Sequence, residues 1–315
     1  MPAPMIIDAH MHIYRSRDHG LRNKQGYDIW EYGSRPDVNF SRATGTLEEA
    51  AHDMDRAGIS KAVVVNLFAA RRARQDAIAG LPDELDQGQR EQAIKDIDSS
   101  MGQRIEEFNV WGCGLARGNP RLVPYISADP WALPGEEGPA HIQRMVGRHG
   151  ARGIKLHPVV QEFHMSDRRM WPIYQACQEL GLPIIAHSGP ARGAVQYGEP
   201  RAFAEALGAF PRLTLVLAHM GGGAWQQALE IAQAFPNAYF DCCEIMEWTG
   251  GPNAPSDRQL AQLIKDVGPE RVLMGSDFPW YDLDHSVQRV MELPLLAREE
   301  KEAILGANAA RILGL

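Results

Sequence analysis

Eight short apolar runs recur along the chain of 315 residues and limit the folds that it can adopt. The runs are rich in Ile, Val, Leu and Tyr and do not alternate with polar residues, which is typical of strands buried on both faces of a parallel sheet. In the second half of the chain, strand follows helix about every thirty residues, as in repeated βα units. Eight such units predict an α/β fold of the (β/α)8 TIM barrel type. The predicted strands are residues 4–9, 61–66, 122–128, 152–156, 183–186, 213–218, 238–242 and 271–275.

Composition and charge exclude several classes of protein. Hydrophobic residues make up 44% of the chain, and 40 acidic against 32 basic side chains give a net charge of −8. A nucleic-acid-binding protein would need a basic face, and a membrane helix would need about 18 consecutive apolar residues, which no segment offers. The N-terminus carries no secretory signal pattern, and the four cysteines show no CxxC spacing. We therefore expect a cytoplasmic protein with one barrel domain over residues 1–315, and neither nucleic acid nor membrane as partner.

Helix signals lie between the apolar runs. The sequence Thr46-Leu-Glu-Glu49 is a capping box, so a helix is expected to begin there and to end at Gly58. Asp167 is expected to cap a helix that ends before Gly181, with Pro172 either kinking the helix or delaying its start. Apolar residues at helical spacing predict further helices over residues 224–235, 256–267 and 299–313.

Two stretches exceed what a minimal barrel needs. One insertion covers about residues 13–45, after the first strand, and the other about residues 68–120, after the second, with a charged helical segment near residues 83–108. Long connections after barrel strands lie over the catalytic face, so both stretches could be lids or pocket walls. A dimer contact or a solvated surface helix is an equally open interpretation.

Metal-binding residue types follow the apolar runs at the same end. His10 and His12 close the first run, and because alternate strand residues point the same way, both are expected to face the barrel axis while Met11 faces the helices. The carboxyl ends of barrel strands form the face on which active sites are built. The other polar residues that close runs are Lys155, His157, His187, His219 and Asp277.

This placement predicts a metal site at the carboxyl ends of the strands. Neutral imidazoles together with one carboxylate suit Zn²⁺ or a similar divalent transition ion. Such an ion lowers the pKa of its bound water towards about 7 and so supplies hydroxide without a strong base. The remaining histidines lie in predicted loops or helices and are interpreted as background: His19, His52, His141, His149, His164 and His285.

Other residues have two interpretations each. Arg192 follows His187 closely and could meet an anionic substrate or lie on the surface. Trp280 could form a wall of the site or cap the barrel. Cys243, with its neighbour Cys242, is interpreted as a small buried hydrophobe, because no general base is expected beside it. The glycines at 221–223 could offer backbone N–H groups to an anion, although they lack the spacing of a nucleotide-binding loop.

With these residues in view, the chain resembles the amidohydrolase superfamily. The resemblance is to the branch of proteins similar to aminocarboxymuconate-semialdehyde decarboxylase, and the matching motifs span nearly the whole chain in the family's order. The motifs are Asp8-Ala-His-Met-His12, Gly153-Ile-Lys-Leu-His-Pro158, Ala186-His187, Ala218-His-Met-Gly-Gly-Gly223, Gly275-Ser-Asp-Phe-Pro279 and Asn308-Ala-Ala-Arg-Ile-Leu-Gly314.

The resemblance implies a ligand set that the pattern alone does not fix. It implies a metal ion, usually zinc but alternatively another divalent ion such as Mn²⁺, held by His10, His12, His187 and Asp277. One ion is expected rather than two. His219 would act beside the ion, orienting or deprotonating bound water, and Asp277 would also accept a proton.

Lys155 leaves the number of ions open. In binuclear members of the superfamily, a lysine in a similar setting is carboxylated and bridges two metal ions, and His187 and His219 would then hold the second ion. Alternatively, Lys155 binds a substrate carboxylate or pairs with a neighbouring acid. His157 is expected to line the pocket rather than to bind metal.

The first functional hypothesis is metal-dependent hydrolysis of a small lactone, amide or carboxylated ring-cleavage product. The alternative is non-oxidative decarboxylation, in which a protonated group, here His219, delivers H⁺ to carbon while an arginine or Lys155 holds the carboxylate. A hydratase is a further option, and a non-catalytic metal protein is the hypothesis from another class. In each enzymatic case we expect a small-molecule substrate with a carboxylate, held by Lys155, His157, Arg192 or Trp280, and a homodimer or larger homo-oligomer.

Overall fold

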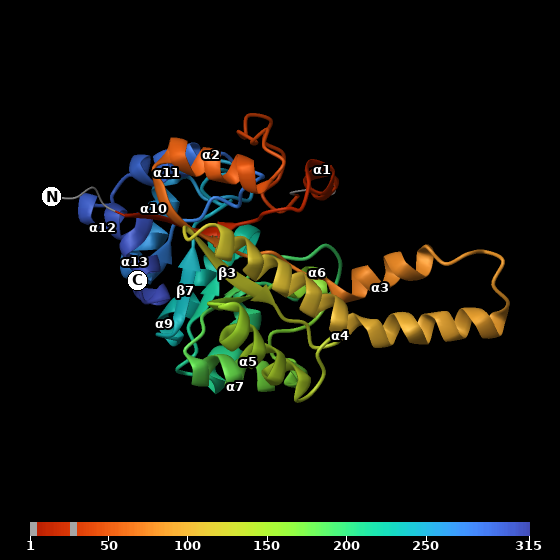
Figure 1. Cartoon of the computed structure of the whole chain (residues 1–315). Coiled ribbons are helices and arrows are strands. Elements are labelled where there is room, and N and C mark those ends of the chain that lie inside the picture. The colour runs from red at the N-terminus through yellow and green to blue at the C-terminus, as the bar shows by residue number, and fades with distance from the viewer. Residues whose placement is uncertain (1–4, 26–29) are drawn as a thin grey trace.

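The computed structural model describes residues 5–25 and 30–315 and contains one sheet of eight parallel strands in sequence order. The predicted first strand begins at residue 4, which lies outside the described residues. Each observed strand overlaps its predicted apolar run, so the (β/α)8 barrel is confirmed (Figure 1). The strands are β1 (Ile6–Met11), β2 (Ile59–Val64), β3 (Leu122–Ser127), β4 (Gly153–Leu156), β5 (Ile184–Ala186), β6 (Leu215–Leu217), β7 (Ala238–Asp241) and β8 (Val272–Leu273).

Backbone contacts between β1 and the segment after β8 bring the two ends of the sheet together. The N–H of Ala9 donates to the carbonyl of Met274 at 2.9 Å, and the N–H of Asp277 donates to the carbonyl of His10 at 2.8 Å. Met11 also forms a parallel bridge with Phe278. These bonds place the first histidine motif directly beside Asp277.

An irregularity in β1 directs its side chains. Ile7 and Ala9 belong to the apolar cluster that also contains inward-facing residues of the other strands. Strict alternation along the strand would then turn the side chain of His10 outward. The pairing of β1 with β2 shifts register between Asp8 and Met11, which interrupts the alternation, and His10 lines the cavity inside the barrel. Met11 packs against the helix that follows residue 46, as predicted.

Two predicted helices are confirmed closely. Helix α2 (Leu47–Ala57) has the capping box of Thr46 and ends at Gly58, whose φ of 69° is left-handed. Helix α10 (Asp257–Val267) begins after a second capping box at Ser256. Helices whose bounds were not predicted are α1 (Arg17–Gln25), α3 (Ala70–Ala79), α5 (Glu137–His149), α6 (Pro158–Gln161), α8 (Ala204–Ala209) and α11 (Leu283–Glu292).

The other predicted helix boundaries have different outcomes. Asp167 caps a short 3₁₀ turn, and helix α7 (Trp171–Leu180) starts after it, so the delayed start expected from Pro172 and the end before Gly181 are confirmed. The start predicted for helix α9 (Ala228–Ala234) was wrong by four residues, because Ala224 has a non-helical backbone conformation and the residues up to Gln227 form a 3₁₀ turn. The helix predicted over 299–313 is confirmed to within one residue, as α12 (Arg298–Glu302), a π-helical turn and α13 (Asn308–Leu313) in direct succession.

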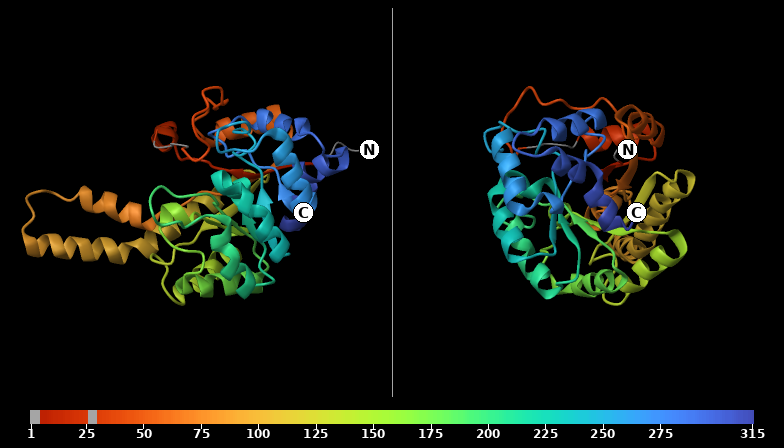
Figure 2. Two further views of the ribbon diagram at one scale, coloured as in Figure 1. Left: turned by 180° about the vertical axis from the view of Figure 1, so that it is seen from behind. Right: turned by 90° about the vertical axis from the view of Figure 1, so that its left-hand side faces the viewer.

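The second insertion forms a projecting helical hairpin. Helix α3 runs outward, and α4 (Gln87–Gly118) returns to the barrel, extending ten residues beyond the predicted end at residue 108. Figures 1 and 2 show α3 and the first half of α4 reaching well beyond the rest of the molecule. Within the described residues, no helix has the length and apolar character needed to cross a membrane.

Candidate metal centre

The carboxyl ends of the strands meet around one cavity of about 370 Å³. All but one of the site residues predicted from the sequence line this cavity. They are His10, His12, Lys155, His157, His187, His219, Asp277 and Trp280.

His10, His12 and Asp277 form the tightest cluster of candidate ligands. Oδ1 of Asp277 lies 3.2 Å from Nε2 of His12 and 3.6 Å from Nε2 of His10. One ligand atom from each residue lies within 4.8 Å of the others, so a single ion could reach all three. Asp277 has a φ of 57°, a left-handed conformation that is uncommon for aspartate and frequent at functional sites.

The charges of this cluster suit a cation. Burial lowers the pKa of His10 to about 4 and also lowers the pKa of His12, so both imidazoles are neutral near pH 7. Burial by itself would raise the pKa of Asp277, but the hydrogen bond from His12 and the nearby imidazoles hold it well below its ordinary value. Two neutral imidazoles and one carboxylate therefore lie together at the cavity.

Asp241 lies behind the histidines and was missed by the sequence analysis. Its Oδ2 lies 2.9 Å from Nδ1 of His10, and its Oδ1 accepts the backbone N–H of His219 at 2.8 Å. The thiol of Cys243 also donates to Oδ1, at 2.9 Å. The predicted seventh run continues to residue 242 and so hides Asp241, whereas the strand ends at this residue. The rule that polar residues close barrel strands could have found it.

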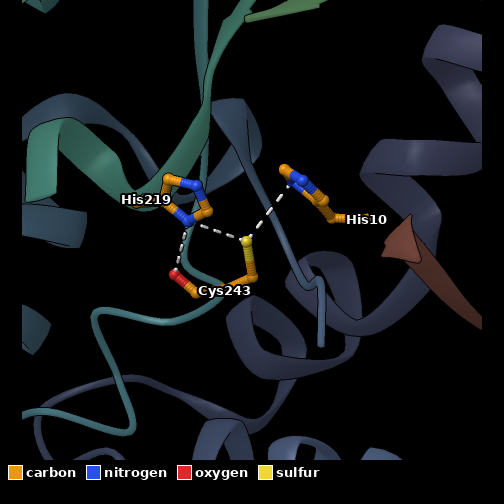
Figure 3. A group of neighbouring side chains, drawn as sticks. All are labelled: His10, His219 and Cys243. Atoms are coloured by element: carbon orange, nitrogen blue, oxygen red, sulfur yellow. Dashed lines mark hydrogen bonds between the residues drawn. The ribbon is translucent and has the colours of Figure 1, made fainter. Parts of the chain in front are cut away.

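Cys243 contacts two histidines, contrary to the expectation that no base lies beside it (Figure 3). Its Sγ lies 3.2 Å from Nδ1 of His219 and 3.4 Å from Nδ1 of His10, close enough for a metal cluster. However, burial and the nearby Asp241 carboxylate raise the pKa of the thiol well above its usual value, so the thiolate that metals require is disfavoured. Hydrogen bonding accounts for this group without an ion.

Lys155 occupies the centre of the site. Its Nζ lies 2.8 Å from Nε2 of His10, and the side chain is almost completely buried. Burial lowers the pKa of Lys155, although the carboxylates of Asp277 and Asp241 oppose this shift by favouring the charged form. The printed hydrogen-bond partner of the Lys155 amine is His10 rather than an acid, and the three interpretations of Lys155 stay predictions.

His187 and His157 stack on one another, with ring centroids 3.9 Å apart. His187 also meets His219 edge-on at 4.9 Å. Nδ1 of His157 accepts the backbone N–H of Val160 at 3.3 Å, so this ring caps α6. The capping bond gives His157 a local structural partner.

Both insertions contribute walls to the cavity, as the lid or pocket interpretation predicts. The first supplies Tyr14, His19 and Asn23, and His19 is therefore not the background residue that was expected. The second supplies Arg72 from α3 and, from α4, two aromatic residues. The aromatic residues lining the cavity are Tyr14, Phe108, Trp111 and Trp280.

Arg192 and the glycine segment have other surroundings. The guanidinium of Arg192 lies over the ring of Trp30, 5.6 Å from its centroid, and Arg192 does not line the cavity. The N–H of Gly223 donates to the carboxyl group of Glu31 in the first insertion at 3.1 Å, and burial raises the pKa of that carboxyl group to about 7. A Cβ on Gly222 would lie 2.5 Å from that carboxyl group, so glycine is required for the approach.

Comparisons with known proteins identify the family and the fold. A family model described as an amidohydrolase matches residues 7–315. A 2-amino-3-carboxymuconate-6-semialdehyde decarboxylase from Dictyostelium discoideum is 24% identical over 204 residues, so the match spans about half of each protein, 55% of this chain and 56% of the relative.

Two solved structures show the same fold. An uncharacterized TIM-barrel protein from Bordetella bronchiseptica has a TM-score of 0.69 and 23% identity, with 98% of each chain covered. A dihydroxybenzoic acid decarboxylase from Polaromonas, solved with manganese and the inhibitor 2-nitroresorcinol, has a TM-score of 0.63 and 15% identity, with 99% of this chain and 97% of the other covered.

Proposed function

This chain belongs to the amidohydrolase family, and on that premise we propose that it is a metal-dependent decarboxylase of a small, planar carboxylic acid. The sequence analysis placed hydrolysis first and decarboxylation second. The order is reversed here because the named relatives with an activity are decarboxylases, one of them solved with manganese. The observation that carries the proposal is the shared cavity of the Lys155 amine and the His10, His12 and Asp277 cluster.

The residues present fit one divalent ion. His10, His12 and Asp277 offer two neutral nitrogens and an oxygen within reach of a single point, and His187 at the same cavity is the proposed fourth ligand. We propose Zn²⁺ or Mn²⁺, one ion per chain. When bound, the ion would polarise substrate oxygens and stabilise negative charge.

The chain's own side chains then bind and orient the substrate. Lys155 is proposed to hold the substrate carboxylate, because an ammonium is a strong donor to carboxylates in a dry site. Phe108, Trp111 and Trp280 form aromatic walls that suit a planar ring and exclude water. Arg72, at α3, is a second cation on the cavity wall and could meet another polar group of the substrate.

His219 is proposed to move the proton. Its Nδ1 faces the backbone carbonyl of Cys243 at 3.4 Å, which leaves Nε2 for the cavity. In the reaction, the bond between carbon and the carboxylate breaks, the electron pair stays on carbon, and carbon dioxide leaves. Nε2 takes up a proton and passes it to that carbon, so that hydrogen replaces the carboxylate.

Hydrolysis is the second candidate, and the same contact of His219 favours it. An imidazole whose Nδ1–H donates to a carbonyl presents a basic Nε2, which suits deprotonation of water. The substrate would then be a small lactone or amide with a carboxylate.

Isotope labelling separates the two reactions. The metal-loaded chain is incubated with hydroxybenzoate-type and ring-cleavage acids in D₂O, and with lactones and amides in H₂¹⁸O, with His10→Ala as the inactive control. Decarboxylation releases carbon dioxide and places deuterium on the carbon that lost it. Label from ¹⁸O in a product carboxylate, without carbon dioxide, would establish hydrolysis instead.

A further inference from the structure

Helix α1 of the first insertion lies at the cavity but has almost no apolar attachment to the barrel. His19 and Asn23 of this helix line the cavity, and Figures 1 and 2 show α1 at the same end of the barrel as α3. Gly20 is the one buried residue of α1, and Leu21, its single apolar side chain, is 45% exposed. A helix of nine residues depends on tertiary contacts for its stability, so polar contacts must hold α1 in place.

Lys24 provides such a contact near the end of α1. Its Nζ donates to the backbone carbonyls of Ser41 at 2.6 Å, Ala43 at 2.9 Å and Pro279 at 2.8 Å. An ammonium group has three N–H bonds, so the three carbonyls use all of its donor capacity. Hydrogen bonds from a charged donor are stronger than neutral ones, and here three of them converge on one side chain of a short helix.

The three carbonyls belong to segments that are themselves fixed to each other at this end of the barrel. The N–H of Ser41 donates to the carbonyl of Trp280 at 2.8 Å, and Phe40 forms an antiparallel bridge with Tyr281. Trp280 also lines the cavity. Lys24 therefore ties α1 to a wall of the cavity that does not depend on α1 for its own support.

Gly20 allows a second close approach of α1. A Cβ at this position would overlap the backbone carbonyl of Thr44 and would lie 3.3 Å from the ring of Tyr14. This contact is made by backbone and adds no apolar side chain of α1 to the core. The hydrogen bonds of Lys24 are therefore a large part of what keeps α1 on the barrel.

We propose that α1 is a lid over the cavity and that Lys24 is the positioning residue that holds it closed. In the closed position, His19 and Asn23 stand at the cavity and limit the entry of small molecules. When the hydrogen bonds of Lys24 break, α1 moves away while the barrel and its core stay folded. The proposal concerns access to the cavity, so it goes beyond the proposed reaction and holds for either decarboxylation or hydrolysis.

Modification of histidines measures this access without a substrate. The full chain is treated with diethyl pyrocarbonate, and the rate at each histidine is followed by mass spectrometry. His157 and His219 line the cavity and are not proposed metal ligands, so they report entry of the reagent. Lys24→Met is expected to raise both rates by about tenfold, because charge-assisted hydrogen bonds are lost. The exposed His52, which does not line the cavity, is expected to react at the same rate in every variant.

A second lid variant and a matched control complete the set. Gly20→Ala places a Cβ against the carbonyl of Thr44 and is expected to increase access as well, because it pushes α1 away from the barrel. Lys301→Met is the control, since Lys301 also donates to a backbone carbonyl, that of Met291 at 2.7 Å, and does not line the cavity. The control is expected to leave the rates at the cavity histidines unchanged.

Hydrogen–deuterium exchange of residues 17–25 measures the hold on α1 directly. Exchange is expected to be faster in both lid variants and unchanged in the control. Faster exchange without a rise at His157 and His219 would show that α1 is not a lid, and unchanged exchange in Lys24→Met would show that this lysine does not hold α1. A rise at His141, which is fully buried and does not line the cavity, would indicate general unfolding. Each of these three results would overturn the proposal.

Discussion

Nδ1 of His10 donates to Oδ2 of Asp241 across 2.9 Å, in a part of the barrel where both side chains are almost fully buried. Burial by itself would raise the pKa of Asp241, but the contact with His10 holds it at about 2, so this carboxylate is ionised and can only accept. His10 must therefore carry its proton on Nδ1. Its Nε2 is left as a lone pair facing Asp277 and Lys155, which is the form that binds metal.

We expect Asp241→Asn to weaken metal binding by about 10- to 100-fold. Oδ1 of Asp241 accepts from the N–H of His219 and the thiol of Cys243, so the asparagine amide is expected to keep its oxygen there and to turn its nitrogen towards His10. That nitrogen cannot accept from His10, so the imidazole would favour the tautomer whose Nε2 carries hydrogen. The dissociation constant for Mn²⁺, measured by isothermal titration calorimetry and by electron paramagnetic resonance of free Mn²⁺, checks this. Asp55→Asn, at an exposed residue paired with Arg121, is the control. Unchanged Mn²⁺ affinity in Asp241→Asn would contradict the role given to this contact.

The stacked residues His157 and His187 have different proposed roles, because His187 is a proposed metal ligand and His157 is a proposed pocket residue. We expect His187→Ala to lose most bound metal, because it removes a proposed ligand. We expect His157→Ala to retain about one ion per chain, because the ring of His157 caps α6 through Val160. Metal content measured by mass spectrometry on both variants decides the assignment. Retention of metal by His187→Ala would remove His187 from the ligand set.

Apolar patterning predicts the barrel because each buried strand needs a continuous apolar run. The strand-end rule likewise predicts that His12, His187 and Asp277 share one face of the barrel, and all three line the same cavity. Both inferences depend on local sequence and on the geometry common to all barrels, so they can be made from the sequence alone. The inward direction of His10 is a different case, because it depends on the register shift in β1, which is a property of strand pairing.

Residues fixed by long-range packing escaped the sequence analysis. Arg192 follows His187 by five residues, yet its guanidinium lies against Trp30 of the first insertion. His19 and Arg72 reach the cavity only because α1 and α3 pack over the strand ends. Nothing in the spacing of these residues encodes which loop covers which strand.

The position of Lys155 predicts how its removal affects the enzyme. We expect Lys155→Met to raise KM for the carboxylate substrate by about 10- to 100-fold, because a charge-assisted hydrogen bond is lost. We also expect it to keep one ion per chain and to bind that ion more tightly, because the amine no longer lies 2.8 Å from Nε2 of His10. Arg192→Met, outside the cavity, is the matched control and should leave KM unchanged. A fall from two ions to one in Lys155→Met would instead identify a lysine that bridges metals.

An ion pair between residues that do not line the cavity predicts a pH dependence of stability. Nδ1 of His285 lies 2.7 Å from Oε2 of Glu247, which is almost fully buried, and this contact raises the pKa of His285 above its ordinary value of 6.5. Asp282 favours the charged imidazole as well, whereas burial and the nearby Arg289 oppose it. A histidine whose pKa is raised by folding stabilises the protein fully below pH 6.5, and this contribution is lost as pH rises through the raised value.

We therefore expect His285→Gln to lower the melting temperature more at pH 6 than at pH 9. The difference should correspond to about 1 kcal/mol or less, because about a third of the His285 side chain is exposed to solvent. Scanning calorimetry of wild type, His285→Gln, Glu247→Gln and the double variant at both pH values completes the cycle. In the Glu247→Gln background, the imidazole has no carboxylate to pair with, so His285→Gln should have the same effect at both pH values. A larger loss at pH 9 than at pH 6 in the wild-type background would show that the neutral imidazole, rather than the charged one, stabilises the fold.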